Sequence, residues 1–179
     1  HLSKGFEDWR QNLDMRLDDL IQTVAAPPQP EEPPAAESDE RWERVIFGDQ
    51  FCRDPESAES RQELICDVLA GVEAAKGLAA QLMLIHSAPK DKMAELLKEV
   101  GEAYYRWRPR SSPTHDPMET ALVACLTRHV ESTGLRNTIQ LVRPGEPFDP
   151  KRHFTSERGN EVVTVRGWIV LRENGKPFT

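Results

Sequence analysis

Residues with side chains that could carry chemistry are few, and they are scattered along the chain. The internal histidines do not stand at the spacing of a zinc or metalloprotease motif; they are His86, His115, His129 and His153. The sequence also lacks a phosphate-binding P-loop, a dinucleotide-binding glycine fingerprint and a Gly-x-Ser-x-Gly nucleophile elbow. We therefore expect no metal ion, no cofactor and no enzymatic activity.

One cysteine and one histidine stand four residues apart in an expected helix. Cys125 and His129 could in principle form a thiolate–imidazole pair of the kind that activates a nucleophile. Because both flank the apolar stripe of that helix, we favour a buried thiol beside a partly exposed histidine. The cysteines are odd in number and lack metal-binding spacing, which predicts reduced thiols in a cytoplasmic protein; they are Cys52, Cys66 and Cys125.

The run from Tyr104 to Arg110 interleaves aromatic residues with arginines, a composition typical of a surface on which nucleic-acid bases stack. The run also ends an expected helix, where arginine side chains interact favourably with the last carbonyl groups. Phosphate binding needs clustered Lys and Arg, whereas this chain has a net charge of −7. No apolar stretch approaches the ~20 residues of a membrane span. We therefore expect a helix cap and a protein contact, with no nucleic acid and no membrane as partner.

The N-terminal residues are expected to form a helix followed by a linker. Apolar residues recur at steps of three and four, which predicts an amphipathic helix over residues 1–24. This helix either pairs with a second copy as a short coiled coil or packs back on its own chain. Residues 25–40 are rich in proline and glutamate and are expected to form an extended linker.

Residues 41–134 are expected to form a helical dimerisation and bundle domain. Residues 41–52 hold an apolar cluster without clear periodicity, which predicts an irregular packed segment. Helical spacing then predicts three helices, over residues 54–87, 90–108 and 116–133. Asp116-Pro117 is a capping arrangement that opens the last helix, and Gly134 closes it. The short connections favour antiparallel neighbours.

Residues 135–179 are expected to form a small C-terminal all-β domain, so the predicted fold class is α+β. Apolar and β-branched runs predict strands at residues 138–142, 162–165 and 168–171. The prolines after the first run cannot continue a helix or sit inside a sheet, so an ordered loop is expected there. In this loop we expect Phe148 to fill the core of the domain and Asp149 to accept N–H bonds of a turn that Pro150 fixes. Asn174-Gly175 predicts a type I′ hairpin turn, after which the sequence looks clipped.

The C-terminal residues also follow the motif order of a known domain. A Gly-Leu pair and an apolar strand precede the loop Gly-x-Pro-Phe-Asp-Pro-x-x-His, and a Val-Val-x-Val run leads into Arg-Gly-Trp. This order resembles the C-terminal β-domain of GrpE, the nucleotide exchange factor of DnaK-type chaperones. The matching residues are Gly134, Leu135, Ile139 to Val142, Gly145 to Asp149, Pro150, His153, Val162 to Val165, and Arg166 to Trp168.

The resemblance implies a co-chaperone and not an enzyme. A GrpE-like homodimer holds a helical stalk and bundle, and its β-domain wedges into the nucleotide-binding domain of a DnaK-type ATPase and promotes ADP release. On this view the loop residues Gly145, Pro147, Phe148, Asp149, Pro150 and His153 form a structural motif that keeps the β-domain rigid.

Arg166, Trp168 and Arg172 are expected to contact the partner, because Trp and Arg are frequent anchors of interfaces. Gly167 lies between them, and Met118 stands where the resemblance places a glycine next to the chaperone contact. An open alternative makes Trp168 a core residue and the two arginines ordinary solvated residues. The departures from the GrpE pattern also keep open a rival function, a helical adaptor that bridges partners with a purely structural β-domain.

Overall fold

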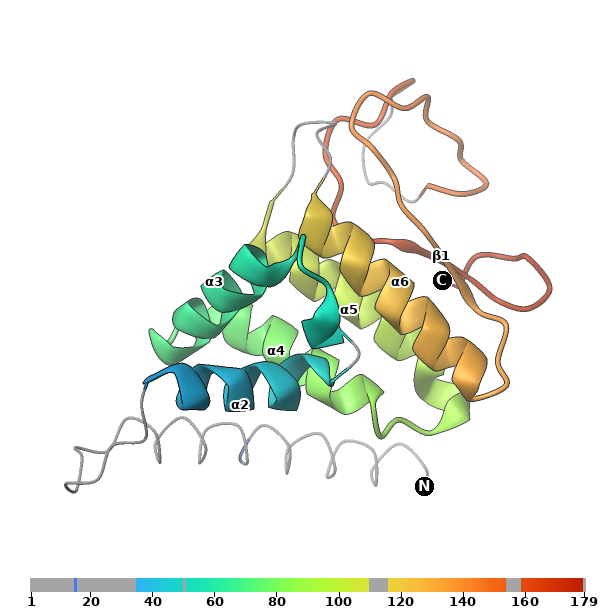
Figure 1. Ribbon diagram of the computed structural model, residues 1–179. Helices are drawn as coiled ribbons and strands as arrows, with labels where there is room; N and C mark the ends of the chain where they lie inside the picture. Colours follow the sequence, from blue (N-terminus) through green and yellow to red (C-terminus); the bar gives the residue numbers. More distant parts are fainter. Residues whose placement is uncertain (1–14, 16–34, 50, 110–115, 154–158, 179) are drawn as a thin grey trace. The chain divides into compact units, whose positions relative to one another are not determined.

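The computed structural model describes residue 15 and residues 35–49, 51–109, 116–153 and 159–178. The predicted helix over residues 1–24 and most of the predicted linker lie outside these residues. Within them, the chain forms five α-helices and a two-stranded antiparallel sheet (Figure 1), so the predicted α+β class is confirmed. The chain divides into two compact units, one ending at Leu84 and the other beginning at Ile85.

The first unit contains α2 (Ala35–Phe47), a short 3-10 helix (Phe51–Arg53), α3 (Ala58–Leu69) and nearly all of α4 (Glu73–Ile85). The irregular segment expected over residues 41–52 is therefore wrong, and the expected linker ends before residue 35. The apolar cluster is helical after all, because Trp42 and Ile46 stand one turn apart and are both buried. Val45, on another side of the same helix, stays exposed.

The single long helix expected over residues 54–87 is instead the pair α3 and α4, bent by 113°. Gly71 has a φ of +80°, a backbone conformation that glycine adopts without strain because it has no Cβ atom. The N–H of Gly71 donates to the carbonyl of Val68 and the N–H of Val72 to that of Asp67, which closes α3 as a Schellman motif. No single helix in the described part of the chain is long and apolar enough to span a membrane, although the bent pair would be by length and composition.

A buried arginine connects the elements of the first unit. Arg61 of α3 is 3% exposed, and its Nε donates to Glu43 of α2 at 2.5 Å. Its two Nη atoms donate to the backbone carbonyls of Asp54 and Cys52 at 2.6 and 3.0 Å. The loop before α3 is thus fixed to both helices, and the guanidinium charge is neutralised by the Glu43 carboxylate.

The second unit contains a short 3-10 helix (Lys90–Lys92), α5 (Met93–Trp107) and α6 (Pro117–Ser132). The predicted caps of α6 are confirmed. The Asp116 side chain accepts a hydrogen bond of 3.0 Å from the N–H of Met118. At the other end Gly134 has a φ of +80°, and the N–H of Leu135 donates to the carbonyl of Val130.

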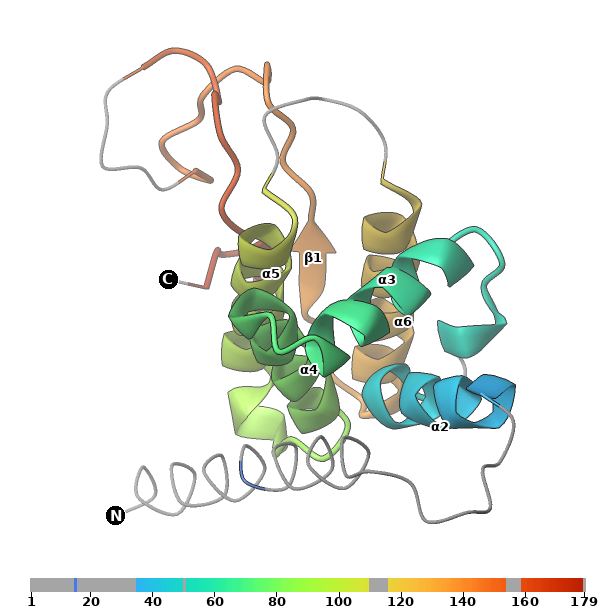
Figure 2. The same cartoon turned by 90° about the vertical axis from the view of Figure 1, so that its left-hand side faces the viewer.

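Strands β1 (Thr138–Gln140) and β2 (Ile169–Leu171) pair antiparallel, with Ile139 opposite Val170. Strand β2 contacts α5 and β1 contacts α6, and Figure 2 shows β1 drawn between these helices. The strand expected over residues 162–165 does not form; among the described residues, this stretch follows an isolated bridge between Pro147 and Glu161. The boundary expected at residue 135 is not a boundary between compact units, because the strands belong with α5 and α6.

The expected hairpin after β2 is present, but its turn differs from the prediction. Arg172 and Lys176 are joined by a backbone hydrogen bond of 2.9 Å, and Phe178 donates to the carbonyl of Val170 at 2.8 Å. Gly175 has a φ of +71°, whereas no non-glycine residue in the described part of the chain has a positive φ. A type I′ turn needs positive φ at both central residues, so this turn is of another type.

Candidate functional site

The segment that carries the resemblance is fixed to the helices of the second unit by Trp168. This side chain is 5% exposed, and its indole lies against Gly101 of α5. A Cβ atom at position 101 would come within 2.9 Å of the indole, closer than real Cβ contacts allow. The expectation that Trp168 presents a contact surface is therefore wrong, and the alternative of a core tryptophan holds.

The indole N–H of Trp168 meets a carboxylate that is completely buried. Glu119 of α6 is 0% exposed, and its Oε1 accepts a hydrogen bond of 3.2 Å from Trp168 Nε1. The same oxygen accepts a hydrogen bond from the hydroxyl of Tyr105 in α5. Its Oε2 accepts a hydrogen bond of 2.8 Å from Arg143 Nη1. A buried carboxylate is stable only with such partners, since burial without them costs several kcal/mol.

Arg143 supplies the positive charge of this buried cluster, which we call the Glu119 cluster: Glu119, Tyr105, Arg143 and Trp168. Burial disfavours the charged guanidinium, but the hydrogen bond and the charge of Glu119 outweigh it and raise the pKa of Arg143. Arg143 lies just after β1, and Trp168 lies just before β2. Both ends of the long connection between the strands are thus fixed to one residue of α6.

Sequence reasoning did not single out Glu119 or Arg143. Glu119 stands three residues after the helix cap Asp116, where an acidic residue is explained locally by the capping pattern. Its partners come from three other parts of the unit, and only the tertiary structure brings them together.

A second buried carboxylate explains the run from Tyr104 to Arg110. The Tyr104 hydroxyl donates to Asp116 Oδ2, and Arg108 Nη1 lies 3.5 Å from Asp116 Oδ1. Burial, followed by this hydrogen bond, raises the pKa of Tyr104 well above its usual range. Tyr104 and Tyr105 are both buried, so neither offers a face to a nucleic-acid base. Trp107 is half-buried, with the guanidinium of Arg108 lying 4.5 Å from its ring centroid.

The loop that carries the Pro-Phe-Asp-Pro motif is held by short-range hydrogen bonds. As expected, Asp149 caps the turn: its Oδ1 accepts a hydrogen bond of 2.9 Å from the N–H of Lys151. The Asp149 N–H donates to His153 Nδ1 at 3.1 Å, so the neutral imidazole carries its proton on Nε2. Phe148 is half-buried and packs its ring against His153, at 5.6 Å between centroids. The expectation that Phe148 fills the core is therefore wrong.

The remaining motif residues lie around this turn. Gly145 has a φ of +90°, which glycine adopts without strain, and its N–H donates to the carbonyl of Val162 at 2.8 Å. Pro147 and Pro150 are exposed. They shape the loop through their fixed φ, and their rings are not part of a core.

The thiol and imidazole in α6 do not form a catalytic pair. Cys125 is buried, and burial raises the pKa of its thiol. His129 Nε2 lies 3.1 Å from the carbonyl oxygen of Ile85, and its ring packs edge to face on His86. The favoured interpretation of a buried thiol beside a half-exposed histidine is confirmed. Within the described residues, no three metal-ligating side chains come together.

The other residues expected to contact a partner divide into buried and exposed ones. Met118 is 0% exposed and presents no surface, which contradicts its expected role. Gly167 is half-exposed and lies against Glu102 of α5. Arg166 and Arg172 are exposed, so these two do present their charged groups to solvent.

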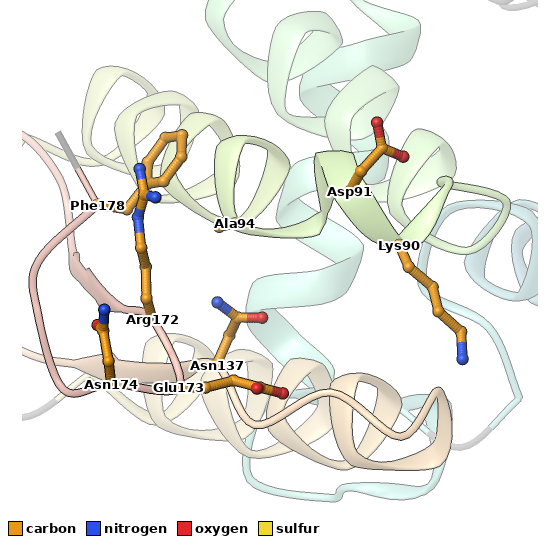
Figure 3. Close-up of a pocket in the computed structure, with 8 residues that line it drawn as sticks. All are labelled: Lys90, Asp91, Ala94, Asn137, Arg172, Glu173, Asn174 and Phe178. Atoms are coloured by element: carbon orange, nitrogen blue, oxygen red, sulfur yellow. The ribbon is translucent and has the colours of Figure 1, made fainter.

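Arg172 also lines a pocket of about 380 Å³ at the hairpin (Figure 3). Its guanidinium lies 5.0 Å from the ring centroid of Phe178, and Figure 3 shows the two side chains next to each other. Charges of both signs line the pocket, which contains Lys90, Asp91, Ala94, Asn137, Arg172, Glu173, Asn174 and Phe178. This mixture gives no preference for one small ligand.

Compared with known proteins, the chain matches no family model, and no curated protein or solved structure matches it significantly. The assignment of function therefore depends on the residue pattern and on the geometry described above.

Proposed function

We propose that this chain is a GrpE-like nucleotide exchange factor. On this proposal it binds the nucleotide-binding domain of a DnaK-type ATPase, promotes release of ADP, and catalyses no reaction itself. The motif order from Gly134 to Trp168 supports this assignment. We include in the proposal that the chain acts as a homodimer.

The observation that carries the proposal is the attachment of the resembling segment to α6 through the Glu119 cluster. An exchange factor works by linkage: it binds the open ATPase better than the closed one, so binding shifts the ATPase toward the state that has lost affinity for ADP. A flexible segment would adapt to both states and shift neither. Hydrogen bonds from Arg143 and Trp168 to Glu119 instead hold both ends of the connecting segment in one geometry.

The burial of Trp168 changes which groups can make the contact. Among the residues expected to contact the partner, the exposed groups are the side chains of Arg166 and Arg172 and the half-exposed backbone of Gly167. Strand β1 adds one further element, since within the described residues it pairs with β2 alone and its other edge is unpaired. A partner strand could therefore add to this edge as well as contact the arginines.

The rival function is an adaptor that binds partners without opening an ATPase. The burial of Trp168 and Met118 favours it, because both residues expected at the exchange contact belong to the core. Release of fluorescently labelled ADP from DnaK-type ATPases of the same genome separates the two functions. Acceleration supports exchange, whereas binding without acceleration supports the adaptor.

A further inference from the structure

Positive charge is concentrated in the C-terminal quarter of this acidic chain. Residues 135–179 contain eight Lys and Arg against five Asp and Glu, although the whole chain has a net charge of −7. The excess of negative charge therefore lies in residues 1–134. Such an asymmetry produces a local positive potential even on a protein that is acidic as a whole.

Six of these cations are exposed and form no ion pair with any described residue: Arg136, Lys151, Arg152, Arg166, Arg172 and Lys176. Two cations of the neighbouring helices differ, since Lys92 in the 3-10 helix pairs with Glu95 at 3.0 Å and Lys98 in α5 pairs with Glu102 at 2.7 Å. The charge of the six is thus not neutralised within the described residues. It remains free to attract a partner.

The strand register places these cations at both ends of the sheet. Thr138 pairs with Leu171, so Arg136 and Arg172 approach one end. Gln140 pairs with Ile169 at the other end, where Arg152 Nη2 donates to Gln140 Oε1 at 3.0 Å. The two ends are separated by roughly 7 Å along the strand, at about 3.4 Å per residue.

Exposed carboxylates near these cations, among them Asp91 in the pocket that Arg172 lines, reduce the potential without cancelling it. Glu173 adjoins Arg172 at the hairpin, and Glu161 lies in the connecting segment. Arg172 is held in place by the Phe178 ring beside it (Figure 3). A cation that is already ordered loses less side-chain entropy when a carboxylate binds to it.

We propose that these six cations form a docking surface for an acidic patch on a partner protein. Three aromatic residues of this unit, Tyr104, Tyr105 and Trp168, are buried and offer no face on which nucleic-acid bases could stack. The negative charge of the rest of the chain also disfavours a long polyanion or an anionic membrane, whose charge extends beyond the cationic region. A folded protein with a local acidic patch meets only the cations.

This inference rests on the proposed function where it identifies the partner as the nucleotide-binding domain of a DnaK-type ATPase. The first test measures binding of the full chain to that purified domain, free of nucleotide, by isothermal titration calorimetry. The variant is Arg152→Ala with Arg172→Ala, which removes one cation from each end of the sheet. The control is Lys98→Ala, whose cation is already paired with Glu102. Circular dichroism verifies that both variants are folded.

We expect the double variant to bind about tenfold or more weakly than wild type and the control to bind like wild type. Raising salt from ~0.05 to ~0.3 M should weaken wild-type binding by a similar factor, since exposed charges are screened. Binding that withstands both changes overturns the docking surface while leaving the proposed function intact.

If no ATPase domain binds the chain, that result counts against the proposed function but not against the docking surface. A second measurement then tests the docking surface by itself. Fluorescence anisotropy at low salt measures binding to a labelled peptide of alternating Glu and Ala, to a single-stranded oligonucleotide of equal charge, and to phosphatidylserine vesicles. Peptide binding that the double variant loses supports the acidic-protein surface. Absence of peptide binding, or tighter binding to the oligonucleotide or the vesicles, overturns it.

Discussion

The indole N–H of Trp168 donates a hydrogen bond of 3.2 Å to Glu119, a carboxylate with no exposed surface. This bond joins the residue that precedes β2 to the first turn of α6. The arrangement gives Trp168 two separable contributions to stability, one from its buried ring and one from its N–H group.

We expect Trp168→Phe to lower the free energy of unfolding by ~1–3 kcal/mol, because the ring still fills most of its site but Glu119 loses a donor. Trp168→Ala should cost more, about 3–5 kcal/mol, because it also leaves a cavity. Urea denaturation followed by circular dichroism measures both. Trp107→Phe, at a half-buried position, is the control and should cost less than either. Equal effects of Trp168→Phe and Trp107→Phe would contradict the importance of the Glu119 bond.

The close approach of Trp168 to α5 predicts opposite effects for two glycine substitutions. Gly101→Ala should destabilise the chain by ~1–3 kcal/mol, because the new methyl group would lie 2.9 Å from the indole. Gly77→Ala is the matched control in α4, where the added group meets nothing within 4 Å apart from its chain neighbours and the backbone of its own helix. There the higher helix propensity of alanine should stabilise the chain by about 0.5–1 kcal/mol. Stabilisation by both substitutions would show that the indole does not occupy this position.

The ion pair of Glu119 with Arg143 predicts strong coupling in a double-mutant cycle. Glu119→Gln and Arg143→Met should each destabilise the chain by about 2 kcal/mol, a value reduced for the partial exposure of Arg143. The double variant should be less destabilised than the sum of the two, since neither charge is then left alone. Strictly additive losses in urea denaturation would mean that the two side chains do not interact.

The raised pKa of Tyr104 predicts a loss of stability in alkaline solution. Since the unfolded phenol titrates near pH ~10, the protonated form that folding favours contributes fully below that pH. The contribution is lost as the pH rises above ~10. Burial raises the pKa of Cys52 to about 11 and also raises that of Cys125, which acts in the same direction. Comparing Tyr104→Phe with wild type isolates the tyrosine: the variant should lose less stability between pH ~8 and ~11. An equal loss in both proteins would exclude Tyr104 as the source.

Local sequence signals predicted those parts of the fold that depend on neighbouring residues. The capping side chain of Asp116, the glycine at the end of α6 and the hairpin at Gly175 each follow from a few adjacent residues. The break at Gly71 could not be located in the same way. Gly71 and Gly77 have equal intrinsic propensity, and only the hydrogen bonds that close α3 distinguish them.

The candidate site was less predictable because its residues meet through tertiary contacts. Trp168 is buried because Gly101 leaves room for the indole on α5, a position 67 residues earlier in the chain. The partners of Glu119 lie on α5, after β1 and before β2. The exposed arginines Arg166 and Arg172 were predicted correctly as solvent-accessible, since nothing in the described unit draws their charges inward.

The measurement that tests the central proposal most directly is the rate at which a DnaK-type ATPase releases labelled ADP, followed by stopped-flow fluorescence as the chain is added. We expect the rate to rise with chain concentration to a plateau at ~5–150 times the spontaneous rate. This range is the typical factor by which one bound partner weakens the affinity for another, taken here as a change in the ADP release rate alone. Arg166→Ala with Arg172→Ala should lower the acceleration without unfolding the protein. A release rate that stays at the spontaneous value, while calorimetry shows the chain bound to the ATPase, would contradict nucleotide exchange.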